Sequence, residues 1–398
     1  MFYSTTRYLL NNMNFITTLL LKKYKPKLIV VFGAYGRDES RRAIHAVLAA
    51  HTTVYSASAG SFTKEFRNYT GGLATGLKAL FKKSAFPHVI VVDSSTDNKE
   101  YKKLREILGI DLAIVMPLGD IPSFSDLFSG PGPLAREILK EIRAARRAIL
   151  CGDDESLVDI AAELIRKPIM FGFDEANDIR IESANPELLI KRRAHGRTHV
   201  KVDHDGNFIP FSIPSSFGKR NIYAAGAALG VSVPYDINFI SAAQDLQKYT
   251  SPANAFHLSS GIKSTALITV TKNVTPYAAR EAIELIGRFR ETGSIARSVL
   301  VLSDIILDKE GETEGLHRYL GELAAHNADV LILIGERVIF SEEEAQKHGM
   351  SAENIFRFHD VGDAALKTQE ILERMDGVLI LGSESIDLKK IIDEIRVR

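Results

Sequence analysis

Short apolar runs alternate with helical patterns along most of this 398-residue chain. This alternation predicts a parallel sheet covered by helices, because each buried strand must be followed by a helix that returns the chain to the same edge of the sheet. The first series of expected strands is 28–32, 88–93, 112–116, 147–151 and 168–171. Helical patterns between and after these strands fall at 38–50, 72–82, 99–107, 133–146 and 155–166.

A second series of the same kind begins after 250–254, a Ser- and Pro-containing stretch that we interpret as a linker. Its expected strands are 265–270, 298–302, 329–334 and 377–381, and its helices lie near 276–290, 313–326, 341–347, 363–374 and 386–396. Between the two series, 178–212 is β-rich with a hairpin turn at Asp205-Gly206, and 220–247 is helical.

These patterns predict an α/β protein in three parts. Residues 1–27 form an N-terminal helical extension, 28–249 form a first α/β domain, and 250–398 form a second one. The carboxyl ends of parallel strands are the usual place for a ligand. We therefore expect 33–38 in the first domain to face 269–273 in the second across a cleft.

Composition narrows the classes of function. Fifty basic and fifty acidic residues cancel, which argues against a nucleic-acid partner. The apolar run at 15–21 is too short to cross a bilayer and lacks the flanks of a signal peptide, so we expect a cytoplasmic protein without membrane insertion. The only cysteine, Cys151, excludes an internal disulfide and a cysteine-based metal cage; we expect it buried at a strand end.

Residues 27–50 have the order of strand, glycine-rich turn and helix that cradles phosphate in nucleotide-binding proteins. In such loops a lysine and a hydroxyl follow the second glycine, and they neutralise phosphate charge and bind Mg²⁺. This chain has Arg37, Asp38 and Glu39 there instead. The candidate nucleotide-binding residues of the loop are Gly33, Ala34, Tyr35, Gly36, Arg37, Asp38 and Glu39.

Asp38 and Glu39 allow two interpretations. They are favourable in the first turn of a helix, where Arg41 and Arg42 can pair with Asp38. Alternatively, Asp38 binds Mg²⁺ directly in place of the hydroxyl. We favour the first, since an isolated glycine-rich loop is weak evidence of a working nucleotide site.

The order of several motifs carries more information than any one of them. From about residue 20 to 398 the chain resembles the Mur ligases, most closely the branch that adds D-alanyl-D-alanine. The resemblance implies a central P-loop-type domain followed by a Rossmann-like domain, ATP and Mg²⁺ as cofactors, Asp153 near the adenine, and Asp93 at the position of a family acid that can bind metal. The segments that carry it are the glycine-rich loop, 60–66, 151–155, 218–225 and 301–304 with Glu312, Glu314 and His317 after it.

The chain departs from the family pattern where the chemistry lies. Beyond the loop, the family's metal-binding histidine falls on or beside Pro122, its modified lysine falls near Ile138, and its interdomain arginine falls within 253–256, where this chain has no arginine. Only Asn273 survives of the family's C-terminal Asp-Asp-x-Tyr-Asn segment. The remaining candidates for a catalytic role are Lys140, Lys272 and Asn273. About 27 residues precede the first strand, too few for the family's uridine-nucleotide domain.

Two functional hypotheses follow. In the first, a Mur-ligase-like protein has strongly reduced or lost ligase activity, binds ATP and Mg²⁺ poorly, and serves as a partner of a muramoyl-peptide-type ligand or of an active cell-wall ligase. In the second, an active ATP-dependent ligase has a reworked site. There Asp38 and Asp93 would hold Mg²⁺, Arg37 would contact phosphate, and Lys140 or Lys272 would replace the missing cations.

Overall fold

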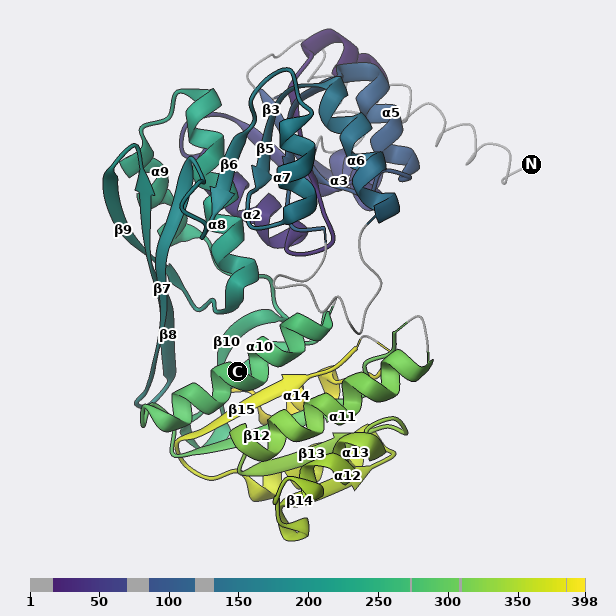
Figure 1. Ribbon diagram of the computed structural model, residues 1–398, viewed down its shortest axis with the longest axis vertical. Helices are drawn as coiled ribbons and strands as arrows, with labels where there is room; N and C mark the ends of the chain where they lie inside the picture. The colour runs from purple at the N-terminus through teal and green to yellow at the C-terminus, as the bar shows by residue number, and fades with distance from the viewer. Residues whose placement is uncertain are drawn as a thin grey trace, which may run out of the picture.

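The computed structural model describes residues 17–69, 86–118, 132–272, 274–307, 310–383 and 385–397. Two sheets organise these residues, one above the other in Figure 1. The upper sheet has nine strands in the order β2-β3-β1-β4-β5-β6-β7-β8-β9, and the lower has six in the order β10-β11-β15-β12-β13-β14. The predicted α/β class is confirmed. The expected helix at 72–82 lies outside the described residues.

The first six strands of the upper sheet are parallel because a crossover connects each to the next. The chain moves to one side from β1 to β2 and to the other from β3 to β4, so right-handed crossovers put the connecting helices on both faces. The strands are β1 Lys27–Phe32, β2 Val54–Ser58, β3 Val89–Asp93, β4 Ile110–Val115, β5 Ala145–Cys151 and β6 Ile169–Gly172. The helices of this part are α2 Arg37–Ala49, α3 Phe62–Tyr69, α5 Lys99–Leu108, α6 Gly132–Ala144 and α7 Glu155–Ala162.

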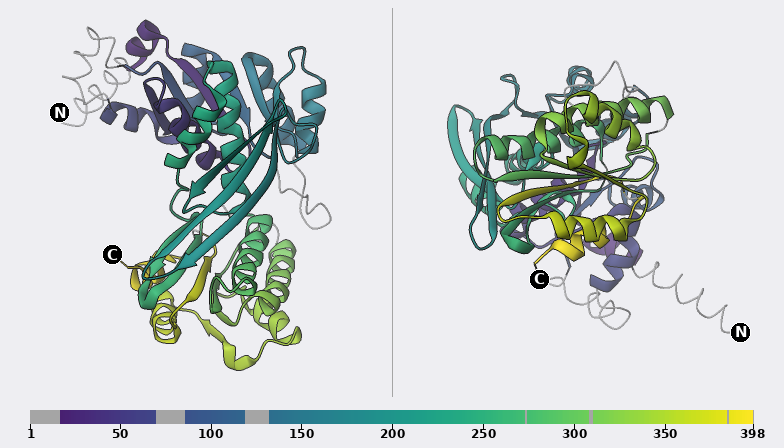
Figure 2. Two further views of the ribbon diagram at one scale, coloured as in Figure 1. Left: turned by 90° about the vertical axis from the view of Figure 1, so that its left-hand side faces the viewer. Right: turned by 90° about the horizontal axis from the view of Figure 1, so that it is seen from below.

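An antiparallel ribbon completes the upper sheet. It consists of β7 (Ile179–Ile190), β8 (Ala194–His204) and β9 (Asn207–Pro214), and Asp205 and Gly206 form the predicted turn with φ of 52° and 77°. The far end of the β7–β8 hairpin extends beside the lower unit in Figure 2, where the Ala194 N–H donates to Ser260 Oγ at 3.0 Å. The helices α8 Gly218–Ser232 and α9 Phe239–Asp245 follow.

The lower sheet is covered on both faces, as the view from below in Figure 2 shows. Alternate residues of its strands point to opposite sides: Leu300 and Leu302 join one core, whereas Val299 and Val301 join the other, with α13 and α14. The strands are β10 Ala255–Gly261, β11 Thr265–Val270, β12 Arg297–Ser303, β13 Val330–Ile334, β14 Ile355–Phe358 and β15 Asp376–Leu381. The helices are α10 Pro276–Glu291, α11 Glu310–Asn327, α12 Ile339–Lys347, α13 Val361–Ile371 and α14 Lys389–Ile395.

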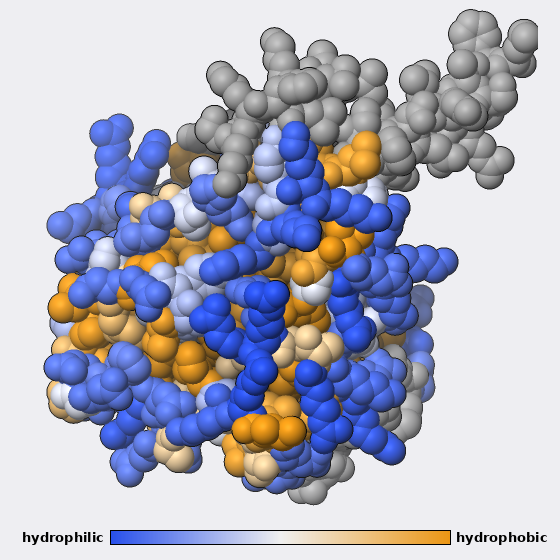
Figure 3. Space-filling model, turned by 90° about the horizontal axis from the view of Figure 1, so that it is seen from above, coloured by the Kyte–Doolittle hydropathy of each residue, from blue (hydrophilic) through white to orange (hydrophobic). Residues whose placement is uncertain are grey.

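Hydrophilic and hydrophobic side chains are interspersed on the upper face of the molecule (Figure 3). Across the described residues, no helix combines the length and the apolar character needed to cross a membrane. Residues 17–24 are helical, and Leu20 and Leu21 of this segment are buried, so the segment packs on the upper unit.

Candidate functional site

The glycine-rich loop follows β1 at the carboxyl end of the upper sheet. Gly33 has a φ of 122°, and a Cβ at this position would lie 2.6 Å from the carbonyl oxygen of Met116. Gly36 has a φ of 77° and is the N-cap of α2. Both positions therefore require glycine, for close approach at the first and for left-handed backbone at the second.

The hydrogen bonds of the loop divide its N–H groups into two sets. The N–H groups of Ala34 and Tyr35 donate to the carbonyl of Pro117 at 2.9 and 3.2 Å, which ties the loop to the end of β4. The first N–H groups of α2, at 37–39, have no acceptor within the helix, as at any helix start. These three groups are the ones that can bind an anion.

Arg41, one turn into α2, joins the two carboxylates that the sequence proposes as metal ligands. Its Nε donates to Asp93 Oδ1 at 2.5 Å, and its Nη2 donates to Asp38 Oδ1. Its Nη1 donates to Ser56 Oγ at 2.8 Å. The side chains of Arg41, Asp38 and Asp93 are only 11%, 18% and 15% exposed. The guanidinium therefore occupies the space between the carboxylates, where a divalent cation would have to bind.

The carboxyl of Asp38 carries a second pairing as well, because Arg42 Nε donates to the same oxygen at 3.2 Å. Burial opposes ionisation of Asp38, but Arg41 and Arg42 outweigh it and hold the pKa of this carboxyl below its usual value. The predicted pairing of Asp38 with Arg41 and Arg42 is confirmed.

Residues from outside the loop carry the positive charges that face Glu39 and the second oxygen of Asp38. Glu39 is buried, and its Oε1 lies 3.8 Å from Nη1 of Arg220, near the start of α8. The same Nη1 donates to the carbonyl of Lys272 at 3.1 Å, and Lys272 Nζ lies 3.8 Å from Asp38 Oδ2. The segment after β11 thus lies against the loop, as the sequence predicts.

Tyr35 makes a further contact between the two units. Its hydroxyl donates to Glu281 of α10 at 3.3 Å, and the Lys219 N–H donates to the other oxygen of Glu281 at 2.7 Å. Burial raises the pKa of Glu281 to about 7, although Lys219 and Tyr35 favour the ionised form. The Tyr35 ring also packs edge-on against Tyr277 with centroids 6.3 Å apart.

A cavity of about 530 Å³ opens over this arrangement. Within the described residues, the Arg37 side chain lines it without a hydrogen bond or ion pair, so Arg37 can bind an anion such as phosphate. Asp38 and Asp93 are both occupied by Arg41, so the residues present do not fit a Mg²⁺ ion. The charged residues lining the cavity are Arg37, Asp38, Glu39, Arg41, Arg42, Glu65, Asp93, Arg220 and Lys272.

Known proteins resemble this chain in architecture more than in sequence. No family model matches the chain. The MurF ligase of Thermotoga maritima, solved in complex with ADP, superposes with a TM-score of 0.70 over 97% of this chain and 83% of that one, at 13% sequence identity. The chain has the Mur ligase fold. The resemblance expected from the motifs is thereby confirmed at the level of architecture.

Two curated proteins match part of the sequence, and both are UDP-N-acetylmuramate–L-alanine ligases. That of Persephonella marina is 33% identical over 106 residues, which is 27% of this chain and 21% of the relative. That of Bdellovibrio bacteriovorus is 29% identical over 113 residues, 28% of this chain and 23% of the relative. The matched segments therefore span less than a quarter of either relative.

Asp153, expected near the adenine of a Mur ligase, uses its carboxylate in hydrogen bonds within the protein. Its carboxylate accepts from the N–H groups of Phe173 and Asp174 at 2.7 and 2.9 Å, and from the Tyr223 hydroxyl at 2.8 Å. The Asn177 amide adds a fourth bond at 3.2 Å. Asp153 thus fixes the loop after β6, and it has little capacity left for a ligand.

The other sequence candidates fall in different places. Lys272 lines the cavity, whereas Lys140 is an exposed residue of α6 and is not among the lining residues. Asn273 and Pro122 lie outside the described residues. Cys151 is buried at the end of β5, as predicted.

Sequence reasoning missed Glu281 and Arg220 as parts of the site. Arg220 was noted only within the segment 218–225, and Glu281 only as part of a helix. An acid in the middle of an amphipathic helix carries no local signal, because its partner Tyr35 is 246 residues away.

Proposed function

We propose that this chain is a Mur-ligase-like protein, related to ATP-dependent carboxylate–amine ligases, whose own ligase activity is strongly reduced or lost. The fold supports the relationship, since the MurF ligase that it resembles was solved with ADP. The loss is argued from the side chains around the glycine-rich loop.

The Arg41 bridge is the observation that carries the proposal. Activating a carboxylate as an acyl phosphate requires a cation that neutralises the transferring phosphoryl oxygens. In this chain both acids that would hold Mg²⁺ are bonded to Arg41. Breaking a largely buried ion pair costs about 3–5 kcal/mol, so a metal ion would have to repay that cost before it could bind.

Nucleotide binding is proposed to be weak and independent of Mg²⁺. The phosphates would meet the loop 33–37, with Arg37 and the first N–H groups of α2 as donors. Arg37 cannot lose its proton and presents a planar fork, so it does not reproduce the point charge of the family lysine. Asp38 and Glu39 would contribute no binding energy, because both already pair with cations of the protein.

The two α/β units are proposed to bind a partner together. The Tyr35–Glu281 hydrogen bond and the Lys272–Asp38 ion pair connect the two units without a ligand. Such a body could serve as a binding partner for a muramoyl-peptide-type ligand or an active cell-wall ligase. This role rests on the retained fold together with the occupied metal position.

The alternative is an active ligase with a rebuilt site. One observation favours it: Lys272 of the second unit reaches within 3.8 Å of Asp38, so a cation from beyond the linker is present at the loop. In this alternative Lys272 would take over phosphate neutralisation from the missing interdomain arginine.

Measuring ADP release distinguishes a chain without ligase activity from an active ligase with a rebuilt site. Wild type and the triple variant Arg37→Lys, Asp38→Thr, Glu39→Thr are assayed with Mg-ATP and muramoyl peptides plus D-alanyl-D-alanine. We expect no turnover by either protein, since groups that act as a unit are not restored one part at a time. Substrate-dependent ADP release by the wild type would overturn the proposal in favour of the rebuilt ligase.

A further inference from the structure

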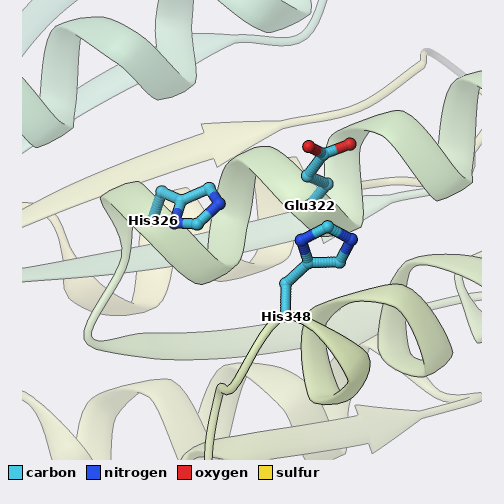
Figure 4. A group of neighbouring side chains, drawn as sticks. All are labelled: Glu322, His326 and His348. Carbon is cyan, nitrogen blue, oxygen red and sulfur yellow. The ribbon is translucent and has the colours of Figure 1, made fainter.

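Glu322, His326 and His348 gather on the lower unit, away from the loop cavity. Glu322 and His326 are one turn apart on α11, so both project from the same side of that helix (Figure 4). His348 caps the C-terminal end of α12, which packs against α11. One ligand atom from each residue lies within 4.8 Å of the other two.

Glu322 and His326 are not committed to other side chains. Among the residues that the structure describes, the Glu322 carboxylate makes no hydrogen bond or ion pair, and the His326 ring contacts only the His348 ring, edge-on at 6.0 Å. Arg318, one turn before Glu322 on the same helix, is the cation best placed to neutralise it. Instead, Arg318 binds Glu314 at 3.0 Å and Glu343 at 3.1 Å.

His348 has a carboxylate behind it. Its Nε2 lies 3.7 Å from Oε1 of Glu344, and that carboxylate is itself held by Lys347 at 2.5 Å. Carboxylates commonly stand behind metal-binding imidazoles, where they orient the ring and raise its basicity. At 3.7 Å this contact is an ion pair rather than a hydrogen bond, so Glu344 stands near the His348 ring without yet fixing its orientation.

We propose that Glu322, His326 and His348 form a Zn²⁺ site that links α11 to the end of α12. Two imidazoles and one carboxylate suit zinc, whereas Mg²⁺ and Ca²⁺ prefer oxygen ligands alone. Three protein ligands leave one position of a tetrahedral zinc to water or a fourth ligand. The only thiol of the chain, Cys151, is buried and offers zinc no competing site.

The geometry requires a small adjustment. Zinc with bonds of about 2.0–2.1 Å holds its ligand atoms roughly 3.3 Å apart, so the three ligand atoms, which lie within 4.8 Å of one another, must approach each other by at most about 1.5 Å. Glu322 and His326 are exposed and His348 is partly exposed, which leaves them free to rotate about their side-chain bonds.

The test is isothermal titration of the full chain with ZnCl₂, with Co²⁺ absorption as a second readout of tetrahedral coordination. We expect one ion per chain, bound more tightly than about 100 µM. His326→Ala and His348→Ala should each weaken binding at least about tenfold, and Glu322→Gln should weaken it while preserving side-chain shape. His359→Ala removes an exposed histidine elsewhere on the lower unit and should leave the affinity unchanged.

Each outcome of these titrations either supports or overturns the zinc site. Zinc binding that survives in both histidine variants would place the metal elsewhere and overturn the proposal, as would wild-type binding weaker than about 100 µM. Circular dichroism of each variant checks that the fold is retained. A zinc-dependent rise in the thermal midpoint, present in wild type and lost in the histidine variants, would support the link between the helices.

Discussion

Replacing Arg41 with methionine should convert the loop into a site that responds to divalent cations. Methionine has nearly the reach of arginine but no charge, so Asp38 and Asp93 would face each other across the space that the guanidinium now fills. Removing one partner of a buried ion pair costs about 3–5 kcal/mol. The acids here are 18% and 15% exposed, and Arg42 and Lys272 still neutralise Asp38, so we expect a loss of about 2–4 kcal/mol of stability without metal.

Adding Mg²⁺ should then recover most of that loss in the variant alone. A cation present at about 100 times its dissociation constant stabilises the folded state by roughly 2.7 kcal/mol. The assay is thermal unfolding of wild type and Arg41→Met, each with EDTA and with Mg²⁺ in excess. The matched control is Arg42→Met, because Arg42 pairs with Asp38 and is half exposed, but has no bond to Asp93.

We expect wild type and Arg42→Met to be insensitive to Mg²⁺ and Arg41→Met to be stabilised by it. Two results would refute it. One is equal stabilisation of wild type by Mg²⁺, which would mean that the metal binds beside Arg41. The other is an Arg41→Met variant as stable as wild type in EDTA, which would mean that the guanidinium does not hold the carboxylates together.

Three further predictions test the surroundings of the loop. Gly33→Ala should lower the free energy of unfolding by at least about 2–3 kcal/mol, because the new Cβ meets both a positive φ and the Met116 carbonyl. The control Gly349→Ala has a positive φ but open space around the Cβ, so it should cost about 1 kcal/mol; thermal unfolding of both variants measures the difference. Burial raises the pKa of Glu281 from 4.5 to about 7, so its favourable contribution is complete below about pH 4.5 and is lost as the pH rises through 7. Glu281→Gln should therefore flatten the pH dependence of stability and be more stable than wild type by roughly 1–3 kcal/mol at pH 8, and a variant with an unchanged pH profile would contradict this. Asp153→Ala should destabilise by about 1–3 kcal/mol in urea unfolding, because the hydroxyl of the buried Tyr223 and the N–H of the half-buried Phe173 lose their acceptor; a loss below about 0.5 kcal/mol would refute the role given to this carboxylate.

Strands with continuous apolar runs were predictable, and those without them were not. The expected strands at 28–32 and 265–270 match β1 and β11 closely, because burial on both faces leaves a solid run of aliphatic residues. β2, with the sequence VYSAS, alternates buried and half-buried residues at the sheet edge and carries too little apolar signal. β10 was missed because AFHLSSG follows the expected linker directly and pairs antiparallel with β11.

Within the candidate site, contacts between residues close in sequence were predictable, and contacts between residues far apart in sequence were not. The pairing of Asp38 with Arg41 and Arg42 was predictable, since helix geometry alone places them together. The pairing of Arg41 with Asp93 was not, because it depends on β1 and β3 being neighbours in the sheet. Asp93 was identified through the family resemblance as a metal ligand, and only the tertiary structure reveals that an arginine of the same chain reaches it.

Isothermal titration of the wild-type chain with ATP, in the presence and in the absence of Mg²⁺, shows whether Arg41 keeps a metal ion out of the loop site. We expect binding weaker than about 10 µM, roughly −7 kcal/mol. We also expect the same affinity with and without Mg²⁺, since Arg41 already occupies the position between Asp38 and Asp93. A dissociation constant below about 10 µM that requires Mg²⁺ would show that the loop binds a metal–nucleotide complex in spite of Arg41.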